Sequence, residues 1–244
     1  MLQIPDPVSI RDEVARVAVR LRDACDESPA SELEDSEGLS EALLNVLDAL
    51  RQRAHSLDSE ELSQTEPRLG DLGDHGIDLL ARLADLARRV KLEADAEMLE
   101  GLTLPLACCV ARAGGELSRI GPVVNAAAAL ANTLRDPKEL TELYRLTDDV
   151  AQAVSIRITE APPGSDDGRA WRVLVLNRAI IATRSQQPPL MEAAFDALLE
   201  ALPADAPGFF REGVEQMDAL NYPPAVRVVM QRYYDAWGTD RRLH

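Results

Sequence analysis

The sequence predicts an all-α protein of about eight to ten antiparallel helices, arranged as an α-solenoid-like helical repeat or as an irregular helical bundle. Apolar residues recur at three- and four-residue steps along most of the 244-residue chain, which is the spacing of one face of a helix. Proline, glycine and short polar stretches separate these segments, as turns between helices do. Residues 102–134 are also dense in Ala, Val and Leu, and between Val123 and Leu130 only Asn125 is polar. That pattern predicts a central helix enclosed by others.

Residues 1–160 are expected to form an aliphatic-cored helical domain or subdomain, because all nine aromatic residues lie at Tyr144 or later. A long loop is expected at residues 56–76, which are polar and contain Gly70, Gly73 and Gly76. The helices predicted in this part span residues 9–25, 39–57, from about 74 onward, 93–106 and 121–134.

Asp136, Pro137 and Glu139 form the strongest local signal in the chain. Asp136 would be the N-cap, Pro137 the first helical residue and Glu139 the third. This order predicts the start of a helix. Its apolar stripe continues to Ile158. Residues 161–168 are rich in turn formers and are expected to form a loop or linker. Residues 169–244 would then form an aromatic-containing helical subdomain, with a single continuous domain as the alternative.

Two segments of the C-terminal part match at an offset of 35 residues. Pro188 and Pro189 align with Pro223 and Pro224, and apolar positions follow in step. A helix pair that repeats at such a spacing is typical of α-solenoids, although the tetratricopeptide pattern is missing and no family is assigned. The helices predicted here span residues 171–183, from 188 onward, 205–219 and from 223 onward.

The charge of the chain is strongly acidic, with 42 Asp and Glu against 26 Lys and Arg and a formal net charge of −16. This charge opposes binding to phosphate backbones and anionic lipids, so nucleic acid and membranes are not expected as partners. A protein with a basic surface fits better, although acidity also serves solubility. Residues 26–41 hold seven acidic residues and no Lys or Arg. The interaction residues proposed in this stretch are Glu32, Glu34, Asp35 and Glu37.

No sequence motif indicates a reaction. The three cysteines, Cys25, Cys108 and Cys109, lack C-x-x-C spacing, so neither a disulfide framework nor a zinc knuckle is expected, and the adjacent pair is interpreted as core. Nucleophile-elbow, P-loop, dinucleotide-binding and H-E-x-x-H motifs are all missing, which favours a non-catalytic protein. The apolar runs are too short to span a bilayer and no signal peptide opens the chain, so a cytoplasmic location is expected.

A candidate metal site consists of Asp71, Asp74, His75 and Asp78. Their spacing of i, i+3, i+4 and i+7 would place three carboxylates and an imidazole on one helical face, which suits a divalent cation. The alternative is that Asp71 or Asp74 caps a helix and the others interact with its positive end. The glycines nearby make a continuous helix doubtful and favour the alternative. Apart from this cation, no cofactor is expected.

A second candidate site is polar and lies on apolar helices. Asn125 and Asn132 share a face of the most apolar helix, where buried amides would line a ligand pocket or fix the packing register. Arg178 lies in the other apolar helix and would pair with a carboxylate such as Asp148 or Asp149.

The C-terminal segment has the composition of an interface hot spot, being rich in Tyr, Trp and Arg. Tyr233 and Trp237 lie on the apolar stripe and are expected in the core. Arg227 and Tyr234 lie off the stripe and would face a partner, although an ordinary terminal helix explains them as well.

These observations predict a non-catalytic protein–protein interaction module or adaptor with an acidic helical surface. The alternative is a metal- or small-ligand-binding protein or an enzyme, with its site around Asp74 and His75 or around Asn125 and Arg178. A third hypothesis is an acidic mimic of nucleic acid that blocks a basic site. A homo-oligomer is compatible with each.

Overall fold

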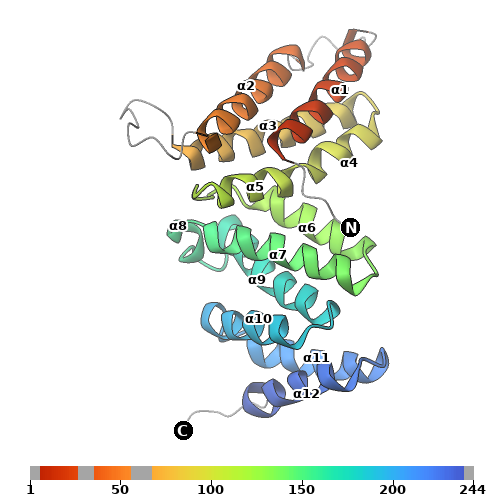
Figure 1. Ribbon diagram of the computed structural model, residues 1–244, viewed down its shortest axis with the longest axis vertical. Helices are drawn as coiled ribbons and strands as arrows, with labels where there is room; N and C mark the ends of the chain where they lie inside the picture. The colour runs from red at the N-terminus through yellow and green to blue at the C-terminus, as the bar shows by residue number, and fades with distance from the viewer. Residues whose placement is uncertain (1–5, 27–35, 56–67, 239–244) are drawn as a thin grey trace. The chain divides into compact units, whose positions relative to one another are not determined.

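The computed structural model describes residues 6–26, 36–55 and 68–238, and in these ranges its regular structure is entirely helical, without a β-strand (Figure 1). The all-α prediction is confirmed. Helices are more numerous than predicted because α8 is a single turn and residues 93–112 form two helices, with Pro105 in the first turn of the second. The described helices are α1 (Pro7–Asp26), α2 (Ser36–His55), α3 (Leu69–Arg89), α4 (Glu93–Gly101), α5 (Thr103–Arg112), α6 (Gly121–Thr133), α7 (Pro137–Ala153), α8 (Ile156–Thr159), α9 (Asp166–Arg184), α10 (Pro188–Ala201), α11 (Ala206–Ala219), α12 (Pro224–Tyr233) and the π-helical turn η1 (Tyr234–Gly238).

The chain divides into two compact units. The described part of the N-terminal unit runs to residue 129 and includes Asp149–Glu160, and that of the C-terminal unit is Leu130–Asp148 with residues 161–238. One boundary therefore falls at the start of the predicted linker, residues 161–168. The division also passes through α6 and α7, so residues 130–148 group with the C-terminal part of the chain.

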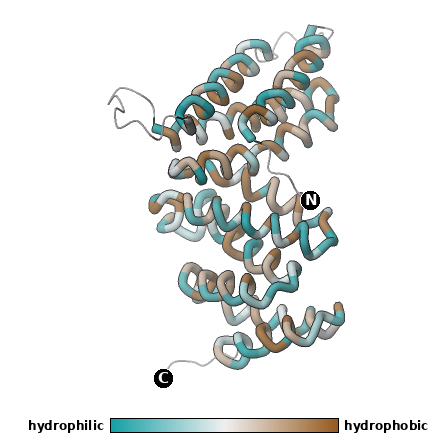
Figure 2. The backbone as a smooth tube through the Cα atoms, viewed as in Figure 1, coloured by the Kyte–Doolittle hydropathy of each residue, from teal (hydrophilic) through white to brown (hydrophobic). Residues whose placement is uncertain are grey.

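The N-terminal unit is built from amphipathic helices around an aliphatic core, and Figure 2 shows hydrophobic and hydrophilic stretches alternating along them. Helix α1 packs on α2, α2 on α3, and α3 on both α4 and α5, and the first three lie side by side in Figure 1. The Arg20 guanidinium on α1 donates to both carboxylate oxygens of Asp95 on α4. Fully buried aliphatic side chains of this core include Ile10, Leu21, Leu43, Ile77 and Leu80.

Helix α3 begins at Leu69 rather than near residue 74, so the loop prediction is wrong for residues 69–76. The part of that loop at residues 56–67 lies outside the described residues. Gly73 and Gly76 face α5: a Cβ on Gly73 would lie 2.6 Å from Val110 Cγ2, and one on Gly76 would lie 3.0 Å from Leu106 Cδ2. These glycines permit a close helix–helix approach within a continuous helix, and they do not form a turn.

Helix α7 begins as predicted and ends earlier than predicted. The Lys138 backbone N–H donates to Asp136 Oδ1 over 3.0 Å, which confirms the N-cap. The helix ends at Ala153 instead of continuing to residue 160, because its C-terminal carbonyl accepts a hydrogen bond from Leu117 N–H and the Ser155 N–H donates to Leu117 O. A competing backbone partner from the segment before α6 therefore replaces the next helical turn, and α8 follows separately.

The C-terminal unit contains two helical hairpins, α9–α10 and α11–α12, which repeat at the predicted offset of 35 residues. Four pairs of buried residues match at this offset, and so do the turn residues Gln186 and Asn221, which both have positive φ angles, of 58° and 51°. The α10 and α12 stripes are therefore equivalent in the structure as well as in the sequence. The matched buried pairs are Met191 with Val226, Ala194 with Val229, Phe195 with Met230, and Leu198 with Tyr233.

Aromatic side chains form the centre of this unit. The Phe195 ring meets the rings of Phe209, Phe210 and Tyr233 edge to face, with ring centroids 5.1–5.6 Å apart. The Tyr233 hydroxyl donates to Asp196 Oδ1 over 2.6 Å. As expected, large rings pack in the C-terminal part of the chain, where Phe195, Phe209, Phe210 and Tyr233 form one cluster.

Candidate functional site

The residues of the candidate metal site lie on one continuous helix, α3, but two of the three carboxylates, Asp74 and Asp78, have other partners. Asp74 accepts hydrogen bonds from the backbone N–H groups of Ser118 and Arg119, at 2.9–3.1 Å, and Asp78 pairs with the Arg119 side chain. Burial raises the pKa of Asp74, while the two N–H donors act in the opposite direction. The acidic face of α3 thus holds the segment that leads into α6.

Asp71 and His75 are exposed on the same helix. Among the described residues, no group of three or more His, Cys, Asp or Glu side chains is arranged to hold a metal ion. Metal binding at Asp71, Asp74, His75 and Asp78 therefore stays a prediction that this geometry does not favour.

The asparagines of α6 are not buried, contrary to prediction. Asn125, Ala129 and Asn132 are all exposed and share one face of α6, so this helix is not enclosed on every side. The exposed face of α6 could not be recognised in the run of alanines, because alanine is small and tolerates exposure to solvent at little cost.

The predicted ion pair of Arg178 is confirmed, with Asp148 as its partner. The guanidinium also lies 5.6 Å from the centre of the Tyr144 ring and donates to the Tyr144 hydroxyl over 3.4 Å. Burial raises the pKa of Tyr144, and the charge of Arg178 opposes that shift. Since Arg178 is 14% exposed, this cluster joins α7 to α9 as a packing contact of the C-terminal unit.

The acidic interaction residues are only partly described. Glu32, Glu34 and Asp35 lie outside the described residues, and Glu37 is exposed in the first turn of α2. An acidic side chain in the first turn also interacts favourably with the helix dipole, so its exposure alone assigns no partner.

Of the two C-terminal residues predicted to lie in the core, Tyr233 is buried as predicted and Trp237 is not. The Arg227 guanidinium donates to the carbonyl oxygens of Tyr222 and Met217, over 2.9 and 2.8 Å, and so caps the C-terminal end of α11. Trp237 is 53% exposed and is not a core residue. The π-helical turn η1 explains this, because a wider turn rotates the residues that follow Tyr233 off the buried stripe. Tyr234 is half-buried in that turn.

An apolar groove of about 310 Å³ opens on the C-terminal unit between the end of α9 and α11. We call it the α9–α11 groove. Its floor includes the buried residues Met217 and Met230, and its rim includes Ile180 and Leu220, which are 43% and 62% exposed. Gly213 also lines it, and a Cβ there would lie 2.6 Å from Met230 Sδ, so glycine leaves room for this flexible side chain. The remaining lining residues are Thr183, Arg184, Phe209, Glu212, Gln216 and Tyr222.

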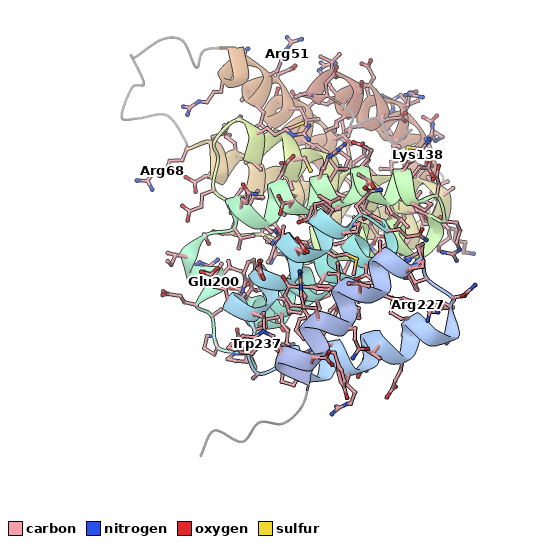
Figure 3. The ribbon with its side chains drawn as sticks, turned by 60° about the horizontal axis from the view of Figure 1, so that its bottom comes forward. Arg51, Arg68, Lys138, Glu200, Arg227 and Trp237 are labelled. Carbon is pink, nitrogen blue, oxygen red and sulfur yellow. The ribbon has the colours of Figure 1, made fainter. Side chains whose placement is uncertain are left out.

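A second hollow, of about 250 Å³, lies between α11 and α12 and shares Met217 and Met230 with the groove. Val228, which is 67% exposed, lines it together with Arg227. Figure 3 shows Arg227 and Trp237 at opposite ends of the segment formed by α12 and η1. Exposed apolar side chains thus lie on both sides of α11, and Met217 and Met230 lie beneath them. Methionine side chains adapt their shape, so this surface suits varied apolar partners.

The two arginines beside the groove are held by backbone carbonyls. Arg184 donates to the carbonyl oxygens of Ala131 and Leu134 at the C-terminal end of α6, as Arg227 does at the end of α11. Positive charge is favourable at these negative helix ends. Burial raises the pKa of Tyr222 in the groove, and the charge of Arg184 opposes that shift. Glu212 is the exposed acidic residue of the lining, and it has no ion pair or hydrogen bond with another described residue.

Comparisons with family models, with curated proteins and with solved structures find no match to this chain. In the described part of the chain, no helix has the length and apolar character needed to cross a membrane.

Proposed function

We propose that this protein is a non-catalytic protein–protein interaction module, and that the α9–α11 groove binds an apolar face of a partner protein. The observation that carries the proposal is the exposure of Ile180 and Leu220 at the rim of an apolar groove. Covering the exposed parts of two such side chains contributes about 1–3 kcal/mol, so leaving them in water has a cost that a partner would remove.

The repeated helical hairpins support this class of function. Proteins built from stacked helix pairs commonly bind partners along the surfaces of their repeats. The groove lies between α9 of one hairpin and α11 of the next, so the repeat itself creates the site. The net charge of −16 favours a basic partner over nucleic acid or an anionic membrane.

The size of the groove indicates a small interface. A volume of about 310 Å³ is at the lower end of the range of ligand pockets and receives a few side chains rather than a whole domain. Affinity would therefore depend on a few anchor residues of the partner.

A displayed library of helical peptides, selected on the immobilised protein, tests the proposal. Peptides that enrich are remeasured by titration calorimetry against the wild type, Leu220→Asp and Val173→Asp. Val173 is the matched control, because it is 39% exposed on α9 and does not line the groove. We expect Leu220→Asp to weaken binding by at least about tenfold, since the charge must be desolvated in an apolar contact, and Val173→Asp to bind like the wild type. Failure of any peptide to enrich, or equal binding to both variants, would contradict the proposal.

A further inference from the structure

We infer that the occupant of the α9–α11 groove is a basic amphipathic helix, whose apolar face covers Ile180 and Leu220 and whose lysine or arginine pairs with Glu212. This inference rests on the proposed function and specifies the chemistry of the partner.

The charge balance at the groove points to a cationic ligand. Arg184 and Arg227 donate to carbonyl oxygens at the ends of α6 and α11, so the negative helix ends compensate both positive charges. Among the described residues Glu212 has no comparable compensation, because it pairs with none of them and lies exposed on the rim. A lysine or arginine of a partner would neutralise the negative charge of Glu212 on this rim.

The geometry of α11 sets the register of the partner. Glu212 and Leu220 lie on and directly after α11 (Ala206–Ala219), two helical turns apart, which is about 12 Å along the axis. A partner helix that lies along α11 would carry its basic residue and its last apolar anchor about two turns apart. Gln216 lines the groove midway between them and offers an amide to the partner's polar edge.

A helix is favoured over an extended strand because the described structure has no β-sheet edge to which a strand can add. The available mode is a helix in a groove, with apolar anchors at i, i+3 or i+4 and i+7. Methionines at the floor, Met217 and Met230, suit side chains of differing shape.

Two fluorescein-labelled synthetic helices test the inference by polarisation at physiological ionic strength. Both carry leucines on one face, and two turns from the last leucine one has lysine and the other glutamate. The proteins are the wild type, Glu212→Lys and Glu215→Lys, where Glu215 is an exposed carboxylate on α11 that does not line the groove. We expect the wild type to bind the lysine helix about two- to fivefold more tightly, the effect of an exposed ion pair. Glu212→Lys should reverse this preference, and Glu215→Lys should retain it.

If both helices bind the wild type equally, or if the preference survives in Glu212→Lys, the assignment of Glu212 is overturned while binding at the groove stands. If neither helix binds the wild type at millimolar concentration, the proposed function fails and the inference fails with it.

Discussion

Replacing Gly73 by alanine tests why α3 contains three glycines. In an ordinary helix interior this substitution stabilises the folded state by about 1 kcal/mol, because glycine loses more backbone entropy on folding. Here the new Cβ would lie 2.6 Å from Val110 Cγ2 and 3.0 Å from its Cγ1. Both distances are shorter than van der Waals contact, so the close packing between α3 and α5 cannot accept the methyl group unchanged.

The magnitude follows from how little Val110 can move. This side chain is fully buried and branched at Cβ, so it has one favoured rotamer in α5. Overpacking costs about 1–3 kcal/mol, and a contact of 2.6 Å with a buried, branched side chain favours the upper part of this range, which exceeds the gain in helix propensity. We therefore expect Gly73→Ala to lower the free energy of unfolding by about 1–2 kcal/mol.

Urea unfolding followed by far-UV circular dichroism measures this change, with Gly101→Ala as the control. A Cβ on Gly101, at the end of α4, meets nothing within 4 Å, so that variant should be as stable as the wild type or up to about 1 kcal/mol more stable. In the Val110→Ala background, Gly73→Ala should no longer destabilise, because the two methyl groups that it meets are gone. A stabilising Gly73→Ala, or equal effects in both backgrounds, would refute the packing argument.

Three further predictions concern side chains that the structure buries or bonds. Asp74→Ala should lower the free energy of unfolding by about 1–3 kcal/mol, because it removes the acceptor of two backbone N–H groups. Asp71 is exposed, so Asp71→Ala should change this free energy little in the same urea assay. Burial, together with the hydrogen bond that Tyr233 donates to a carboxylate, raises the pKa of Tyr233 to about 12. Since an unfolded tyrosine ionises near pH 10, stability should fall as the pH rises from about 10 towards 12, and less so in Tyr233→Phe; an equal fall in both proteins would contradict this assignment. Burial raises the pKa of Cys108 to about 12, so a variant with both Cys25 and Cys109 replaced by serine should react slowly with a thiol reagent at neutral pH until it is unfolded. Fast labelling of this folded variant would show that the Cys108 thiol is accessible.

Helices were predictable from the sequence wherever periodicity alone determines the structure. The stripe of α1 and the cap of α7 depend on residues close in sequence, and both are as expected. The start of α3 and the end of α7 depend on distant residues. The glycines of α3 serve contacts with α5, and Leu117 takes over the hydrogen bonds at the end of α7. No local pattern distinguishes a glycine that packs closely from one that turns the chain.

The candidate site was less predictable than the fold. The Arg178–Asp148 pair was expected from chemistry, because a charge in an apolar helix needs a partner. The exposure of Ile180 was not predicted, because this residue lies in an apolar run that indicated a buried helix. An apolar run in a helix nevertheless turns some of its side chains outward. The exposure of Leu220 and the absence of a described partner for Glu212 depend on how α9 and α11 meet, which composition does not reveal.

The most direct test of the binding groove is NMR of the protein labelled with ¹³C at its methionine methyl groups, titrated with the lysine-bearing helix. Methionine→Leu variants assign the signals. Met217 and Met230 form the groove floor, whereas Met98 is 38% exposed on α4 in the N-terminal unit. We expect the Met217 and Met230 signals to shift and saturate together while the Met98 signal stays in place. A shift confined to Met98, or no shift at saturating peptide, would contradict the assignment of the α9–α11 groove as the binding site.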